Sequence, residues 1–258
     1  MSTLIVIPAR LGATRLPRKP LRLLGGEPLV VRVWERVIGM EIADAVVVAT
    51  DSPDVAAAAR AAGAQVAMTR ENHPSGTDRV AEVANSPAFR GYDTFVNVQG
   101  DEPYIGADAI GGALEQVASG RFPLGTAACR ADAGVLSNPD VVKVVADRHG
   151  RALYFSRAPI PFLRDAGDRA TRDPLVRQHI GVYAYTRDAL NRWVALPPDP
   201  LELSERLEQL RALADGLAMG VAVAAPAEAR GIDTEDDLIA ANARWSAVHF
   251  THKVAGTH

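Results

Sequence analysis

The sequence predicts an α/β domain built around a mainly parallel sheet. Short β-branched runs alternate along the 258-residue chain with stretches of helical periodicity, which is the pattern of β-α-β units. Runs that are apolar throughout, such as residues 4–8 (LIVIP) and 45–50 (AVVVAT), are typical of strands buried on both faces. The length suits one large domain, and 48% apolar residues can form a substantial core.

The first half of the chain follows this alternation closely. We expect strands at residues 4–8, 45–50, 65–68 and 94–99, and helices at 28–39, 53–63 and about 108–119. Pro28 suits the first turn of the first helix. The run Asp51-Ser52-Pro53 caps the second helix, which stops at Gly63.

After Cys129 the rhythm changes. Residues 141–156 read as a hairpin with the turn DRHG, and 157–178 as a polar loop. A strand at 179–185, an amphipathic helix at 201–213 and a capped helix at 231–245 follow. We therefore predict one domain over residues 1–247, with a hairpin and loop excursion at about 139–186. Residues 248–258 are expected to form a disordered tail.

Composition excludes several classes of protein. A net charge of -3 argues against a general nucleic-acid binder. The single cysteine, Cys129, excludes an internal disulfide framework and a multi-thiolate zinc site. The apolar run after Thr3 is too short for a signal peptide, and no run reaches the length of a membrane span. We expect a cytoplasmic protein that contacts no membrane.

A cation-rich loop directly follows the first strand. It contains Arg10, Arg15, Arg18 and Lys19, and the small residues Gly12 and Ala13. Open α/β folds bind ligands at the carboxyl edge of the sheet, where these cations could neutralise a triphosphate. The loop has neither G-x-G-x-x-G nor G-x-x-x-x-G-K-[ST], which argues against a dinucleotide-binding domain and a P-loop. Taken alone, a solvated basic loop fits equally well.

Acidic residues supply a second feature. Asp101 and Glu102 come just after the strand at 94–99, with Gly100 allowing a sharp turn. A carboxylate at this edge, facing a phosphate loop, is the usual means of bringing Mg²⁺ to a nucleotide. From pattern alone Asp233 or Thr234 can cap the last helix, and capping accounts for Asp233. A metal role for Asp233 depends on whether the fold brings it next to Asp101.

Nine motifs together resemble those of the 3-deoxy-manno-octulosonate (KDO) cytidylyltransferase family, the CMP-KDO synthetases. They are IPARLGATRLPRKPL, VVVATD, MTRENHPSGTDRVAEV, NVQGDEP, VKVV, ALYFSRAPIP, HIGVYAY, LEQLRAL and GIDTEDDL, in order from about Leu4 to Leu238. The combination of SGTDR, NVQGDEP and YFSR is the specific part. The resemblance implies a Rossmann-like nucleotidyltransferase fold. It also implies transfer of CMP from CTP to KDO, with pyrophosphate released, in lipopolysaccharide biosynthesis and with Mg²⁺ required.

The resemblance also implies roles for individual residues. The CTP-binding set would be Pro8, Ala9, Arg10, Arg15, Lys19, Ser75, Gly76, Thr77, Arg79 and Gln99. The sugar acid would contact Arg157, His179, Tyr183, Glu208 and Gln209. Asp101 and Asp233 would coordinate Mg²⁺, and the catalytic residues would be Arg15, Lys19 and Asp101. From pattern alone, His179 and Tyr183 fit core packing, and Glu208 and Gln209 fit a solvated helix edge.

Two further expectations concern partners and alternatives. The resemblance implies a homodimer, and the hairpin offers an apolar surface for pairing. A cytidylyltransferase for another sugar acid, such as a sialic acid or a KDO variant, would share the same triphosphate and metal residues. A CTP-binding sensor without catalysis is the alternative from a different class.

Overall fold

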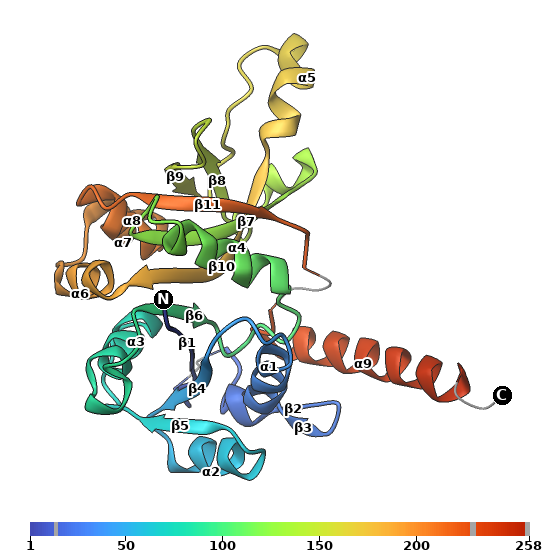
Figure 1. The fold of residues 1–258 in the computed structure, drawn as a ribbon. Coiled ribbons are helices and arrows are strands. Elements are labelled where there is room, and N and C mark those ends of the chain that lie inside the picture. The colour runs from blue at the N-terminus through green and yellow to red at the C-terminus, as the bar shows by residue number, and fades with distance from the viewer. Residues whose placement is uncertain (13–14, 228–230, 256–258) are drawn as a thin grey trace.

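The computed structural model describes residues 1–12, 15–227 and 231–255 of the chain. Within these residues a nine-stranded mixed sheet forms the centre of the molecule (Figure 1). Seven strands follow one another across it in the order β11-β7-β10-β6-β1-β4-β5, and β8 and β9 branch from β10. The expected α/β architecture with a mainly parallel sheet is confirmed.

One half of the sheet is entirely parallel. It contains β1 (Thr3–Pro8), β4 (Ala45–Thr50), β5 (Gln65–Met68) and β6 (Thr94–Val98). β1 pairs with β4 on one side and β6 on the other. All four strands were predicted, and the carboxyl ends of β1 and β6 lie side by side.

The other half is mixed. The long strand β10 (Arg177–Thr186) runs antiparallel to β6 and to β7 (Leu124–Arg130), and β11 (Met219–Ala224) adds to β7 in parallel. The predicted hairpin is present as β8 (Lys143–Ala146) and β9 (Ala152–Ser156). The polar excursion after it carries the short helix α5 (Arg169–Arg172) and forms the top of Figure 1.

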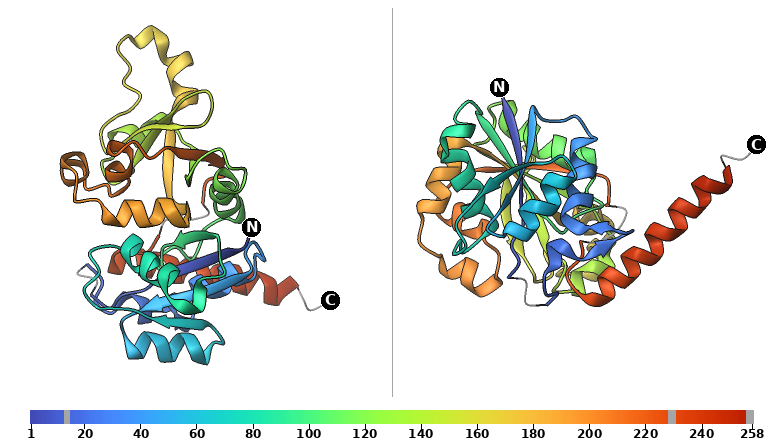
Figure 2. Two further views of the ribbon diagram at one scale, coloured as in Figure 1. Left: turned by 60° about the vertical axis from the view of Figure 1, so that its left-hand side comes forward. Right: turned by 90° about the horizontal axis from the view of Figure 1, so that it is seen from below.

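Helices cover both faces of the sheet (Figures 1 and 2). The predicted ones are α1 (Leu29–Ile38), α2 (Pro53–Ala61) and α4 (Ala107–Ala118). Ser52 caps α2 as expected, its side chain accepting from the N–H of Val55. Elements that were not predicted include the helices α3 (Gly76–Asn85) and α6 (Arg187–Ala195) and the strands β7 and β11.

The single helix expected at 201–213 is two helices in the structure. α7 (Pro200–Glu205) and α8 (Gln209–Ala214) are separated by a break at Arg206, whose φ of 55° is left-handed. The spacing of Leu203, Leu207 and Leu210 suggested a continuous apolar face. Leu203 is instead exposed while the other two are buried, because the break rotates the two helices relative to each other.

The C-terminal helix is longer than expected. α9 runs over Glu235–Ala255, so residues 248–255 are helical where we predicted a disordered tail. The sequence from Ile232 to Ala255 contains no Gly or Pro that would end a helix. Residues 256–258 lie outside the described part of the chain. Figure 2 shows α9 extending away from the sheet.

Among the described residues, no helix is both long and apolar enough to cross a membrane.

Glycines allow α4 to pack directly against the sheet. A Cβ at Gly125 on β7 would collide with the backbone carbonyl of Ala113 on α4. Gly220 is its register partner on β11. A Cβ at Gly220 would collide with the Phe122 ring and would lie 2.7 Å from the side-chain oxygen of Gln116. Because a backbone carbonyl cannot move aside easily, the helix can lie here only over glycine.

We expect Gly125→Ala to lower the free energy of unfolding by roughly 1–3 kcal/mol, since the added methyl group must displace α4. The control is Gly111→Ala on the same helix, where a Cβ meets nothing within 4 Å. Gly111→Ala should stabilise the protein by roughly 0.5–1 kcal/mol through helix propensity. Urea unfolding of both variants measures these changes, and equal effects in the two would contradict the packing argument.

Candidate active site

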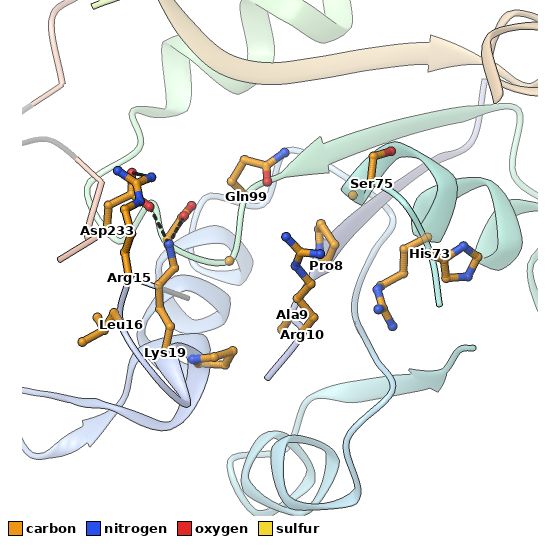
Figure 3. Close-up of a pocket in the computed structure, with 15 residues that line it drawn as sticks. Pro8, Ala9, Arg10, Arg15, Leu16, Lys19, His73, Ser75, Gln99 and Asp233 are labelled. Carbon is orange, nitrogen blue, oxygen red and sulfur yellow. Dashed lines mark hydrogen bonds and ion pairs between the residues drawn. The ribbon is translucent and has the colours of Figure 1, made fainter. Parts of the chain in front are cut away.

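A cavity of about 290 Å³ opens at the carboxyl ends of β1 and β6 (Figure 3). Its wall contains every residue predicted to bind CTP except Thr77, together with Leu16, Pro20, His73, Gly100, Asp101 and Asp233. The residues come from the loop after β1, the start of α3, the loop after β6 and the segment before α9. The structure therefore brings together the basic loop and the acids that the sequence placed far apart.

Gly100 sets the close approach of the two strand ends. A Cβ at this position would lie 2.7 Å from the carbonyl oxygen of Pro8. The chain leaving β6 can cross the end of β1 only because residue 100 lacks a side chain. This crossing places Gln99 and Asp101 on the cavity wall beside Ala9.

Lys19 joins the two predicted metal ligands. Its ammonium contacts the carboxylate of Asp101 and lies 2.9 Å from Oδ1 of Asp233 (Figure 3). Arg15 adds an ion pair of 3.1 Å to the other oxygen of Asp233. Burial disfavours the charged form of Lys19, but the attraction of Asp101 and then Asp233 outweighs it, so the pKa of Lys19 is raised. We call Lys19, Asp101 and Asp233 the acid–lysine cluster.

Asp233 is not the cap of α9. Thr234 caps the helix instead, because its hydroxyl accepts a hydrogen bond from the N–H of Asp237. The Asp237 carboxylate accepts hydrogen bonds from the N–H groups of Asp233 and Thr234. The Asp233 carboxylate is thereby free to face Lys19. The fold places Asp233 near Asp101, since both carboxylates contact the ammonium of Lys19.

Glu102, which follows Asp101, lies in an unfavourable environment for a negative charge. Burial raises its pKa to about 8, with further repulsion from Asp101 and Asp233. Its carboxyl group is therefore mostly protonated at neutral pH, and it can donate a hydrogen bond.

The opposite side of the cavity is formed by the start of α3. Ser75 caps this helix, its hydroxyl accepting the N–H of Asp78. A Cβ at Gly76 would lie 3.4 Å from the Pro8 ring and 3.7 Å from the Gln99 amide oxygen. The crevice at Gly76 is therefore narrow, and the side chains of Pro8, Gln99 and Asn97 lie closest to it.

Arg79 is a buried cation on the cavity wall. Its guanidinium is 2% exposed, pairs with Asp51 at 3.1 Å and donates to Thr69. Burial lowers the pKa of Arg79, and the nearby cation Arg10 lowers it further, against the attraction of Asp51. Arg79 is held in the cavity wall by its contacts with Asp51 and Thr69. Arg10, in contrast, is exposed to solvent.

A second, larger cavity of about 960 Å³ adjoins the first. The two share Arg15, Asp101 and Asp233, so they meet at the acid–lysine cluster. Of the predicted sugar-acid contacts, Arg157 and His179 line the second cavity, and Tyr183, Glu208 and Gln209 do not. The wall also includes Glu102, Gln178, Arg206 and residues 139–142.

His179 has a defined tautomer. Thr126 Oγ1 lies 2.7 Å from the carbonyl oxygen of Val182 and 2.9 Å from Nε2 of His179. The threonine has one hydroxyl hydrogen, which goes to the carbonyl because a carbonyl can only accept. Oγ1 therefore accepts a hydrogen bond from the Nε2–H of His179. Burial lowers the pKa of His179 to about 3, so the ring is neutral at physiological pH.

The predicted residues that do not line a cavity lie behind its walls. Tyr183 packs between His179 and Trp193, with ring centroids 5.4 Å and 5.9 Å away. Glu208 lies 3.0 Å from the Ser75 hydroxyl, and Thr77, which is buried, also hydrogen-bonds to Glu208. Gln209 is buried as well, so a solvated helix edge does not describe it.

Two cations hold the hairpin side of the second cavity. Lys143 is fully buried, and its ammonium donates to the carbonyls of Val141 at 2.7 Å, Asn138 at 3.0 Å and Arg157. Arg157 donates in turn to the carbonyls of Glu205 and Pro139, both at 2.9 Å. Burial lowers the pKa of Lys143. Such carbonyl-bound cations fix the backbone of the wall without using a carboxylate.

The acid–lysine cluster fits a magnesium ion in its donor chemistry. Asp101 and Asp233 converge on one ammonium, so a single cation can contact both carboxylates. Within the described residues no group of three or more His, Cys, Asp or Glu side chains could hold a metal ion. Mg²⁺ is usually bound by one or two carboxylates together with substrate phosphates and water, and this site matches that pattern.

Several wall residues were not singled out from the sequence. His73 pairs with Glu82. It belongs to the motif MTRENHPSGTDRVAEV that carried the resemblance, so that motif could have been used to predict its position on the cavity wall. Gly181 belongs to the motif HIGVYAY, two residues after the predicted His179. Arg206 carried no signal, because the pattern around it favours a continuous helix.

The family model for cytidylyltransferases matches residues 4–219. The chain is 61% identical over 255 residues to a 3-deoxy-manno-octulosonate cytidylyltransferase of Gemmatimonas aurantiaca, covering 99% of this chain and 98% of that protein. It is 47% identical to the protein of the same name from Polynucleobacter necessarius, covering 91% and 92%.

A solved structure agrees with these relatives. It is a CMP:2-keto-3-deoxy-manno-octonic acid synthetase complexed with CTP, with a TM-score of 0.88 and 37% identity over 96% of this chain and 99% of that one. The similarity covers nearly the whole chain in both sequence and structure. The chain therefore belongs to the 3-deoxy-manno-octulosonate cytidylyltransferase family.

Proposed function

We propose that this protein transfers CMP from CTP to the anomeric hydroxyl of KDO, releasing pyrophosphate. The observation that carries the proposal is the meeting of two cavities at the acid–lysine cluster. A nucleotide in the first cavity and a sugar acid in the second would have their reacting groups side by side at Asp101. The names of the relatives and the CTP complex of the 37% identical structure support this choice of substrates.

CTP would lie in the smaller cavity with its triphosphate against the basic loop. Arg15 and Lys19 lie on the wall beside Asp101, and Arg10 faces the same space. An arginine can bind two phosphate oxygens at once, and a lysine acts as a point charge. The cytosine would enter the narrow crevice at Gly76, which a purine would overfill.

The reaction is an in-line displacement at the α-phosphorus. The anomeric oxygen would form a new P–O bond as the bond between the α-phosphorus and the bridging oxygen breaks. Pyrophosphate would depart with the bridging oxygen, and the hydroxyl proton would pass to water. The protein's task is to position the groups and stabilise charge. Arg15 and Lys19 would neutralise the charge that develops on the departing pyrophosphate.

The cofactor would be Mg²⁺, held by Asp101 and Asp233 with phosphate oxygens. When bound it would neutralise phosphate charge and lower the pKa of the attacking hydroxyl. The chain's own part is to hold the two carboxylates together, since both contact the ammonium of Lys19. Arg15, paired with Asp233 at 3.1 Å, keeps that carboxylate oriented toward the cluster.

KDO would lie in the larger cavity. Arg157 offers its remaining N–H groups to the acid, and His179 is a neutral ring on the same wall. Tyr183, Glu208 and Gln209 would act from behind the wall, Tyr183 by fixing the His179 ring and Glu208 by holding Ser75. These roles refine the direct contacts that we first expected for the three residues.

We also propose a homodimer formed through the hairpin and the excursion. Leu153 on β9, Phe162 and Leu175 are all more than half exposed in the single chain. Exposed apolar side chains grouped on one extension are typical of an interface. Because the reaction consumes a nucleoside triphosphate, we retain the expectation of a cytoplasmic enzyme.

The direct test of the function is pyrophosphate release with Mg²⁺. CTP, UTP, ATP and GTP are each combined with KDO, with a sialic acid and with no acceptor. Release only with CTP and KDO is the expected result. Release with CTP and sialic acid would keep the mechanism and change the acceptor, and CTP binding without any release would favour the sensor.

Asp101→Asn should lower kcat by roughly 100- to 1,000-fold, the range found when one charge-stabilising group is removed from an active site. CTP binding should remain measurable, because the basic loop is intact. Asp54→Asn is the matched control, since Asp54 pairs with Arg18 at 2.8 Å on the exposed side of the same loop. Near-normal turnover by Asp101→Asn would refute its metal-binding role.

His179 should stay neutral throughout the range in which the enzyme works. Its folded pKa of about 3 lies below the ordinary 6.5, so His179 favours folding at neutral pH. That contribution is lost as the pH falls from about 6.5 toward 3. Imidazole ¹⁵N NMR between pH 5 and 8 should show a constant Nε2–H tautomer, assigned by its absence in His179→Gln. A midpoint near 6.5 would contradict the buried, Thr126-bound ring.

A further inference from the structure

Arg206 holds a backbone conformation that is unusual for its residue type. Its φ of 55° and ψ of 46° place it in the left-handed region between α7 and α8. Glycine occupies this region freely, whereas an arginine there is strained. The backbone turns so tightly that the N–H groups of Arg206 and Leu207 both donate to the carbonyl of Glu202.

Neighbouring contacts hold this break in place. The Glu205 carboxylate accepts hydrogen bonds from the Ser156 hydroxyl at 2.6 Å and from the Arg157 N–H at 2.9 Å. The Glu205 carbonyl accepts another from the Arg157 side chain. The residue before Arg206 is therefore fastened to the end of β9, on the wall of the larger cavity.

The Arg206 side chain lines this cavity and is exposed. Within the described part of the chain, its guanidinium has no hydrogen bond or ion pair. The three acids of its own segment all have other partners. Glu202 binds Arg211 through two bonds of 2.6 Å and 2.7 Å, Glu205 binds Ser156, and Glu208 lies 3.0 Å from Ser75. Asp140, on the same cavity wall, makes no ion pair with it.

The contrast with Arg157 is informative. Arg157 lines the same cavity but donates to two backbone carbonyls, which leaves fewer N–H groups for a ligand. All the guanidinium donors of Arg206 remain available. A planar fork of donors beside a cavity matches a carboxylate in geometry and charge.

We propose that Arg206 is a specificity-determining residue that binds the carboxylate of the sugar-acid acceptor. This inference rests on the proposed function, since it assigns a residue to the acceptor cavity of that reaction. The left-handed backbone is what directs the side chain out of the helix line and onto the cavity wall.

The test compares Arg206→Gly and Arg206→Lys with the unaltered protein. Glycine suits the left-handed backbone, so Arg206→Gly removes the side chain without disturbing the break. Glu41→Gly is the matched control, because Glu41 has a φ of 53° and lies on neither cavity wall. KM and kcat are measured for CTP, for KDO and for the neutral carboxamide of KDO.

In Arg206→Gly we expect the KM for KDO to rise at least tenfold, with the KM for CTP and for the carboxamide within twofold of normal. Arg206→Lys should recover part of the loss, since it keeps the charge but not the fork. Glu41→Gly should leave every KM unchanged, and both glycine variants should unfold at or above the normal urea midpoint.

An unchanged KM for KDO in Arg206→Gly would overturn the inference while leaving the proposed function intact. Equal rises for KDO and its carboxamide would also overturn it, because the contact would then not be to the carboxylate. Absence of turnover by the unaltered protein with every sugar acid would refute the proposed function, and the inference with it.

Discussion

The arrangement of the active site depends on one interaction, the contact of the Lys19 ammonium with both Asp101 and Asp233. The three residues come from the loop after β1, the loop after β6 and the segment before α9. Two carboxylates this close would repel each other without a cation between them. Lys19 therefore connects the two ends of the chain at the sheet edge, and both cavities take part of their wall from this cluster.

The larger cavity is maintained by a different device, in which charged groups bind backbone rather than one another. Lys143 and Arg157 together bind the carbonyls of residues 138, 139, 141, 157 and 205. The Glu205 carboxylate accepts from an N–H and a hydroxyl at the end of β9. Such bonds fix irregular backbone where no strand or helix does so. The hairpin side of the wall that would face the sugar acid is thus held by these hydrogen bonds, while strand β10 forms another part of the wall.

Much of this architecture could be predicted from the sequence, for identifiable reasons. The strands at 4–8, 45–50, 65–68 and 94–99 were found because they are short apolar runs bounded by turn residues. The basic loop and Asp101 follow such strands directly, so the sequence was enough to predict their position at the sheet edge. The pattern alone could not assign Asp233, because an acid before a helix looks the same whether or not it caps, and only the family resemblance implied a metal role for it. The break at Arg206 was hidden as well, since tertiary contacts of Glu205 impose it on a segment with a helical pattern. The helix at 248–255 was not predicted, because its sequence has no clear apolar face.

The central claim is that the nucleotide and the sugar acid occupy separate cavities and meet at Asp101. A crystal structure with Mg²⁺, KDO and a CTP analogue that has a methylene bridge between its α- and β-phosphorus atoms tests it most directly. The account predicts the cytosine at Gly76, the α-phosphorus beside Asp101, and the sugar acid in the cavity lined by Arg157 and His179. A sugar acid bound outside that cavity, or an α-phosphorus remote from the acid–lysine cluster, would contradict it.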